Sequence, residues 1–402
     1  MSSGDVAWVL VSAALVLLMV PGLALFYGGM VRRKNVLSTF MHSFAALPLV
    51  SLQWMLVGYT LVFGRSHGGI LGGLEHVGLH GLAGAQHGGL PALAYAAFQM
   101  MFAVITPALI SGAFAERMKF SAYAMFAVLW TTLVYDPVAH WIWNEGGWLF
   151  KLAALDFAGG TVIHATAGIA ALVVAKVIGP RLRYPHERPL PHDLTMTLTG
   201  AGLLWFGWFG FNAGSALGAN ALAALAFMNT QLGACGGALA WIVVEWRHRK
   251  KPTALGVASG LVAGLVAITP AAGYVEPWAA VLIGSAAGAA CYLAVLAKYR
   301  FGYDDSLDAF GIHGVGGILG ALLTGVLATR AVNPEGQDGA LFGNVRALGV
   351  QALALGVACV YSAAMTYGLL LLVNRTLGLR VTDSDEKEGL DVTQHGEDGY
   401  AG

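Results

Sequence analysis

Two histidines occupy positions where an ionisable side chain is costly. His164 lies in the stretch DFAGGTVIHATAGIAA and His313 in DAFGIHGVGGILGALLTG, and both stretches are otherwise apolar enough to cross a bilayer. An imidazole at membrane depth needs a polar partner or a wet path, so it marks a functional site by default. Two of them in similar surroundings favour a shared pore, in which ring nitrogens offer hydrogen-bond donors and acceptors to a small molecule.

An acidic residue precedes each histidine. Asp156 lies eight residues before His164, and Asp308 lies five residues before His313. Aspartate is favoured at helix starts, where its carboxylate accepts hydrogen bonds from free backbone N–H groups. We interpret both as structural acids that cap their helices, because a carboxylate deep in a pore would bind cations too tightly for rapid release.

Aromatic residues gather in the same apolar segments and at their outer ends. They can pack a core, face lipid or anchor an interface, and Trp141 and Trp148 have the same options. An aromatic face also attracts a cation, by about 0.5 to 2 kcal/mol per contact, and a serine hydroxyl adds an acceptor. The residues concerned are Phe98, Phe102, Trp141, Trp143, Trp148, Trp205, Phe206, Trp208, Phe209 and Phe211, with Ser215 close by, and the residues alone leave their roles open.

The composition identifies the broad class of protein. Of the 402 residues 57% are hydrophobic and only 11% are charged, which excludes an ordinary soluble domain and indicates a polytopic membrane protein. The formal net charge is zero and no polybasic tail is present, so nucleic acid is not an expected partner. The three cysteines are far apart and form no CxxC motif, and we expect neither a metal nor a cofactor.

Apolar segments of roughly 20 residues are long enough to cross the hydrocarbon core as helices. The sequence predicts eleven of them in an all-α fold. The run that begins at Val6 has no basic segment before it, so we expect it to remain as the first helix. The predicted spans lie near residues 6–28, 40–63, 91–115, 120–140, 157–178, 194–213, 221–244, 253–272, 277–297, 310–328 and 346–373.

Basic residues concentrate in alternate loops, including 32–34, 179–193 and 247–251. By the positive-inside rule these loops are cytoplasmic, which places the N-terminus outside and the C-terminus inside. We therefore expect a multi-pass protein of the cell membrane. The outer loop 64–90 carries four histidines, but their spacing matches no metal-ligand motif, and the sequence leaves open whether the loop binds anything.

An internal echo predicts the architecture. The string ITPA occurs at 105–108 and again at 268–271, and each copy is followed two spans later by a central histidine. A unit of five helices used twice enters the membrane from the opposite side the second time, which is an inverted-topology repeat with its substrate path between the halves. The predicted parts are a transmembrane domain 1–380, with repeats 6–178 and 194–328 and an extra helix 346–373, and a tail 381–402.

With these features in hand, the sequence resembles the ammonium transporter (Amt/Rh) family, in the order typical of the Amt branch. Matching strings run from one end of the chain to the other: GLALFYGGMVRRKN, ALISGAFAERMKFSA, DFAGGTVIHATAGIAAL, WFGFNAGSALGAN, DDSLDAFGIHGVGGILG and EGLDVTQHGEDGY. The resemblance implies an eleven-helix protomer, a homotrimer and one pore in each subunit.

The resemblance also implies roles for individual residues. His164 and His313 are similar to the family's hydrogen-bonded twin histidines. The other roles that it implies are a stacked gate of Phe102 and Phe211 with Phe98 beside it, ammonium recruitment by Trp143, Phe102 and Ser215, a pore-lining Trp208, and a buried structural Asp156 that organises the recruitment site.

A bare cation at the membrane midplane faces a desolvation cost of roughly a few to more than ten kcal/mol. Potassium cannot lose a proton, whereas ammonium can, so we expect the protein to deprotonate ammonium and to conduct ammonia past the histidines. The alternative is an ammonium sensor that signals through the tail. An enzyme is disfavoured, because no nucleophile, metal or cofactor motif lies near the histidines.

The tail contains the polar, acidic string EGLDVTQHGEDGY. Such a segment can be a disordered end. It also resembles the family's regulatory tail, which implies that a PII-type signalling protein docks on the cytoplasmic face.

Overall fold

The computed structural model describes residues 2–182, 184–186 and 190–400. The basic loop 179–193 is thus described in part, and its Arg183 and Arg188 lie outside the described residues, as do the last two residues of the predicted tail.

The prediction of an all-helical membrane fold is confirmed. Among the described residues, ten helical spans are long and apolar enough to cross a membrane, and α11 is a further, shorter apolar helix. The membrane helices are α1 (Ser3–Met30), α2 and α3 (Val36–Gln53, Tyr59–Phe63), α4 (Ala92–Ile110), α5 and α6 (Phe120–Trp130, Asp136–Trp143), α8 (Thr166–Ile178), α9 (Leu194–Gly214), α10 (Ala221–Arg249), α11 (Ala254–Ile268), α12 (Pro277–Phe301), α13 (Val315–Leu327) and α14 (Val345–Thr376).

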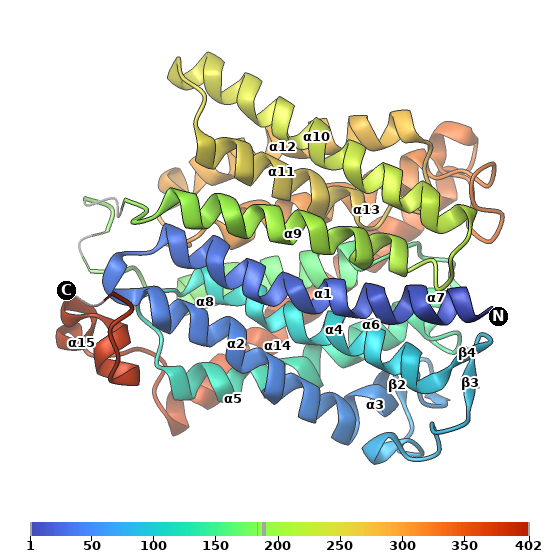
Figure 1. The fold of residues 1–402 in the computed structure, drawn as a ribbon, viewed down its shortest axis with the longest axis horizontal. Coiled ribbons are helices and arrows are strands. Elements are labelled where there is room, and N and C mark those ends of the chain that lie inside the picture. Colours follow the sequence, from blue (N-terminus) through green and yellow to red (C-terminus); the bar gives the residue numbers. More distant parts are fainter. Residues whose placement is uncertain (1, 183, 187–189, 401–402) are drawn as a thin grey trace.

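Short strands and helices lie at the two ends of the helix bundle. At one end, β1 (Ser66–His67) pairs antiparallel with β2 (Leu71–Gly72), and β3 (Gln86–His87) pairs with β4 (Leu90–Pro91). The remaining short helices are α7 (Trp148–Lys151), near these strands, and α15 (Asp383–Glu388), in the tail. Figure 1 shows the long helices running side by side, with the N-terminus and the strands at one end and α15 at the other.

The predicted span 253–272 is longer than the helix in the structure. Helix α11 ends at Ile268 and the chain continues as a turn to about Tyr274. Pro270 lies in that turn, and proline has no backbone N–H with which to continue a helix. The matching Pro107 stays inside α4, which runs on to Ile110.

The inverted repeat is visible where the two halves cross. A Cβ atom on Gly168 would lie 2.1 Å from the backbone nitrogen of Gly314, and a Cβ on Gly317 would lie 2.7 Å from the backbone nitrogen of Ala165. Each of these glycines follows its central histidine by four residues. The two crossings are therefore the same contact made twice, once from each half, and each requires glycine.

Each central histidine lies in a π turn rather than in regular α-helix. The turn η6 (Gly160–Ala165) contains His164 and leads into α8, and η7 (Phe310–Gly314) contains His313 and leads into α13. Single π turns inside helices are frequent at functional sites. Both halves thus begin the membrane helix with a π turn at the same place.

The tail is packed against the helix ends. The carboxylate of Asp391 accepts hydrogen bonds from the backbone N–H groups of Leu37 (3.1 Å) and Ser38 (2.8 Å) at the start of α2. The side-chain oxygen of Gln394 accepts one from the N–H of Phe120 (3.2 Å) at the start of α5. For residues 381–400 the alternative of a disordered end is wrong, because the tail caps two membrane helices.

Candidate functional site

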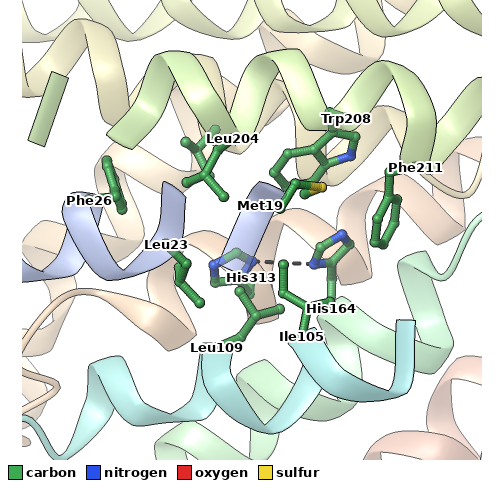
Figure 2. A pocket seen from close by; sticks show the side chains of 11 residues that line it. Met19, Leu23, Phe26, Ile105, Leu109, His164, Leu204, Trp208, Phe211 and His313 are labelled. Carbon is green, nitrogen blue, oxygen red and sulfur yellow. Dashed lines mark hydrogen bonds between the residues drawn. The ribbon is translucent and has the colours of Figure 1, made fainter. Parts of the chain in front are cut away.

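The structure brings His164 and His313 together. Their Nδ1 atoms are 3.3 Å apart, and the two ring centroids are 5.3 Å apart with an angle of 16° between the rings. Figure 2 shows the pair in the interior of the helix bundle, with Phe211 beyond His164 and Leu23 beyond His313. Both side chains are buried.

The hydrogen bond between the rings decides what each ring offers to a third molecule. Only one Nδ1 can donate in this bond, and the other must accept. When both rings are neutral, the donating ring therefore has a bare Nε2, and the accepting ring carries a proton on its Nε2. The Nε2 atom of His164 has no partner among the described residues. The pair thus offers one acceptor and one donor to a small molecule.

The space around the pair is narrow and apolar. Its cavity is about 10 Å³, roughly the room that one water-sized molecule needs. Apart from the imidazoles, the lining residues are Met19, Leu23, Phe26, Ile105, Leu109, Leu204, Trp208, Phe211 and Val262. A charged species in this cavity would lose its hydration without gaining a counter-charge.

Trp208 stacks on His164, with centroids 5.4 Å apart and 22° between the rings. Its indole N–H donates to the hydroxyl of Thr269 (2.9 Å), which in turn donates to the carbonyl of Leu265 (2.8 Å). The indole is therefore satisfied away from the cavity. Thr269 was not among the residues predicted from the sequence, although it belongs to the second ITPA string, and that repeat was the signal that could have found it.

Phe102 and Phe211 form a stacked pair, with centroids 4.3 Å apart and 17° between the rings. Phe98 meets Phe102 edge to face at 4.8 Å. Phe211 lines the histidine cavity, and Phe102 lines a second, larger cavity toward the end of the molecule that carries the strands. The stacked pair thus separates the two cavities, so a molecule that passes between them must displace at least one ring.

The second cavity, here called the outer cavity, has a volume of about 380 Å³. Trp143 and Ser215 both line it. The ring of Trp143 stands nearly perpendicular to that of Phe102, at 84° and 6.1 Å. The hydroxyl of Ser215 donates to the carbonyl of Phe211 (2.9 Å), which leaves its oxygen lone pairs free to accept.

Two neighbouring tryptophans are engaged elsewhere. The indole of Trp141 donates to the carbonyl of Ile70 (2.8 Å), and its ring packs against Trp148 at 6.1 Å. The indole of Trp143 donates to the carbonyl of Asp156 (2.9 Å), which holds its ring in the wall of the outer cavity. Of the three, Trp143 is the one placed to meet a molecule there.

Asp156 caps the first π turn. Its carboxylate accepts hydrogen bonds from four successive backbone N–H groups, at 2.6 to 3.0 Å. The donors are Gly159, Gly160, Thr161 and Val162. This agrees with the capping role expected from the sequence, and the main-chain carbonyl of the same residue holds Trp143.

The capping role expected of Asp308 is wrong. The N–H groups of Ala309 (3.0 Å) and Phe310 (2.8 Å), at the start of η7, donate instead to the carboxylate of Asp305. Asp308 makes an ion pair with Lys298 at 2.5 Å, because the buried ammonium group of that lysine needs a counter-charge. Asp305 lies eight residues before His313, the same spacing that separates Asp156 from His164, so the repeat could have identified it.

Comparisons with known proteins agree with this geometry. A family model described as Ammonium Transporter Family matches residues 7–400. The chain is 50% identical to an ammonium transporter of Bacillus subtilis, covering 100% of this chain and 99% of that one. It is 46% identical to the ammonium transporter Amt1 of Archaeoglobus fulgidus, covering 100% of both chains.

Two solved structures have the same fold. The crystal structure of Saccharomyces cerevisiae Mep2 is 39% identical, with a TM-score of 0.90 over 95% of this chain and 88% of that one. A structure described as Sensor Amt Protein is 30% identical, with a TM-score of 0.91 over 98% of each chain.

Proposed function

This chain belongs to the ammonium transporter family, and from that premise we propose that it takes up ammonium in the outer cavity and conducts ammonia past the histidine pair. One observation carries the proposal: two stacked phenyl rings separate a cavity that can hold a hydrated cation from one that is too narrow and too apolar for it. The same geometry distinguishes molecules that can give up their charge from those that cannot.

The outer cavity captures the cation. The perpendicular rings of Phe102 and Trp143 offer aromatic faces, each of which attracts a cation by about 0.5 to 2 kcal/mol, and the Ser215 oxygen accepts a hydrogen bond. Phe102, Trp143 and Ser215 carry no net charge, so their contacts hold the ion weakly enough for release. Both oxygens of Asp156 already accept backbone hydrogen bonds, so this residue positions Trp143 and the start of η6.

Beyond the gate, the cost of carrying a charge decides what crosses. A cation that stays charged faces roughly a few to more than ten kcal/mol at this depth. Ammonium avoids this cost by leaving its proton behind, and ammonia then donates a hydrogen bond to the bare Nε2 of one histidine and accepts one from the protonated Nε2 of the other. Phe98 and Trp208 hold the gate and the His164 ring in position from the side.

We place the protein in the cell membrane as a homotrimer, with the strand-bearing end outside. Large apolar side chains on the outer face of α10, including Phe227 and Leu239, support contact with lipid or with another subunit. The basic loop 247–251 supports a cytoplasmic position for the opposite end. On this view, residues 1–380 form the transport domain, with repeats 6–178 and 194–328 and an extra helix 346–373, and 381–402 form the tail.

A PII-type signalling protein is the proposed partner of the tail. The exposed acids Glu388, Glu397 and Asp398 support this role, because they lie at the same end as the basic inner loops. Deletion of the whole tail would also remove the caps of α2 and α5. The cleaner experiment changes Glu388 to Lys: loss of PII binding with unchanged uptake supports the docking site, and unchanged binding contradicts it.

A sensor is the second candidate, and the likeness to the structure described as Sensor Amt Protein favours it. A sensor would transmit occupancy of the outer cavity to the packed tail. Its signature is ammonium-dependent protection of the tail against proteolysis without flux.

The decisive experiment reconstitutes the purified protein in vesicles and follows uptake of labelled methylammonium together with potassium flux. The proposed function predicts saturable methylammonium uptake and no potassium flux above that of empty vesicles. Absence of methylammonium uptake by correctly folded protein would overturn it and leave the sensor as the better reading.

A further inference from the structure

One charged residue in the wall of the outer cavity has no part in the function described so far. Glu335 lies in the loop between α13 and α14, and its side chain lines the cavity together with residues from the first half of the chain. It is exposed. Its carboxylate makes no ion pair or hydrogen bond with any other residue in the part of the chain that the structure describes.

The backbone around Glu335 is fixed. Its N–H donates to the side-chain oxygen of Asn333 (3.2 Å), and the N–H of Gly336 donates to the Asn333 carbonyl (3.0 Å). Asn333 is buried. The turn therefore holds the glutamate over the cavity by its own hydrogen bonds.

The turn is also tied to the cavity wall. The N–H of Thr329 donates to the carbonyl of Tyr274 (2.8 Å), and a Cβ on Gly336 would lie 2.9 Å from the Tyr274 ring. Asp338 accepts hydrogen bonds from the Thr329 hydroxyl (3.1 Å) and from the N–H of Arg330 (2.8 Å). Because Tyr274 itself lines the outer cavity, this loop cannot move away without breaking its contacts with the wall.

The charges along the cavity have one sign. Asp156 and Glu335 are the acidic members of its lining, and no basic residue lines it among the described residues. The field of these acids reaches the wall: burial, together with the negative charges of Asp156 and Glu335, raises the pKa of the Tyr274 hydroxyl. The oxygens of Asp156 are occupied by four backbone N–H groups, so Glu335 supplies the carboxylate that an incoming ion can face.

We propose that Glu335 is a specificity-determining residue, which draws small cations into the outer cavity and keeps anions out. This rests on the proposed function, in which ammonium enters from that cavity. A cleft lined by charge of one sign raises the local concentration of an oppositely charged substrate and its rate of entry, by about 10 to 10³ in strong cases. Glu335 stands before the phenyl gate, so it sets the concentration at which uptake half-saturates and leaves the maximal rate to the gate and the histidines.

The test compares Glu335→Gln with the unchanged protein in vesicles, measuring initial methylammonium uptake against concentration at low ionic strength and in about 1 M choline chloride. We expect the KM to rise about three- to tenfold at low ionic strength, which is less than the strongest fields produce because only one charge is removed, with the same maximal rate. In high salt, where the screening length falls to roughly 3 Å, the two KM values converge. Glu335→Lys raises the low-salt KM further.

Glu145→Gln is the matched control, because Glu145 is exposed at the same end of the molecule, carries the same charge and does not line the cavity in the described structure. We expect it to change the KM by less than about twofold. An unchanged KM in Glu335→Gln, or an equal shift in Glu145→Gln, overturns the inference while uptake by the unchanged protein keeps the proposed function. Failure of the unchanged protein to take up methylammonium would refute the proposed function itself.

Discussion

The two segments that carry the histidines have the same local backbone structure but different surroundings. In each, an aspartate eight residues before the histidine caps a π turn, and a glycine four residues after it allows the other half to cross. Asp156 caps four N–H groups beside the open outer cavity. Asp305 caps two and has an ion pair, Lys298 with Asp308, beside it.

This comparison shows which parts of the repeat are the same in both halves and which parts differ. The backbone geometry around the histidines is kept in both halves, and the two imidazoles meet there. The surroundings of the acids have diverged. In the first half, the acid residue also positions an aromatic side chain of the cavity, whereas in the second half the charges of Asp308 and Lys298 neutralise each other in an ion pair.

The largest effect is expected where the halves touch. Gly168→Ala places a Cβ about 2.1 Å from the backbone of the opposite half, and backbone cannot move aside as a side chain can. We expect little folded protein, or a fall in melting temperature larger than that of Gly317→Ala, whose closest backbone atom is at 2.7 Å. Thermal unfolding in detergent measures both. Equal shifts in melting temperature would show that both crossings tolerate a Cβ atom equally well, which would contradict the expected difference between the two halves.

The caps come next. Asp156→Ala leaves four N–H groups without an acceptor and Asp305→Ala leaves two, each worth about 1.5 to 3 kcal/mol when the partner is charged. We expect Asp156→Ala to be the more destabilising and to lower methylammonium uptake as well, since the start of η6 carries His164. Unfolding midpoints and vesicle uptake report the two losses. A larger loss of stability in Asp305→Ala than in Asp156→Ala would contradict this difference between the two halves.

The histidines themselves should affect transport more than stability. In His164→Ala the hydrogen bond between the rings is lost and the narrow cavity gains room for water, so we expect methylammonium uptake to fall about tenfold or selectivity against potassium to weaken. His313→Ala is the matched variant in the other half. Vesicle flux of methylammonium and potassium measures both properties. A His164→Ala protein with unchanged uptake and selectivity would remove the histidine step from the mechanism.

The smallest effect concerns a cap supplied from a distance. Asp391→Ala removes the acceptor for two N–H groups at the start of α2, and loss of such a cap costs about 0.5 to 2 kcal/mol. We expect faster amide hydrogen exchange at Leu37 and Ser38 and little change elsewhere. Asp391→Asn keeps an acceptor oxygen and should lie between the two proteins. Unchanged exchange in Asp391→Ala would mean that the cap does not hold the helix start.

The sequence was sufficient for the helices and for the pairing of the histidines, because long apolar segments and a repeated pattern are local signals. The capping role predicted for Asp308 was wrong, because Asp305 is the aspartate that has the same eight-residue spacing from its histidine as Asp156. The π turns escaped prediction, since their residues are also compatible with regular α-helix. The tail contacts escaped it because Asp391 and Ser38 are 353 residues apart, and no local pattern reports such a pair.

The cap of α2 by the tail has a consequence for the order in which the molecule is completed. Leu37 and Asp391 are separated by 354 residues, so the ribosome makes the second membrane helix long before it makes the tail. Until then, the first N–H groups of that helix lack the carboxylate that accepts their hydrogen bonds. The N–H groups at the start of α2 gain their acceptor only when the tail has been made and docks. A prematurely terminated product therefore differs from a finished one at the start of α2, whose first amides stay without their acceptor, although its membrane helices are all in place.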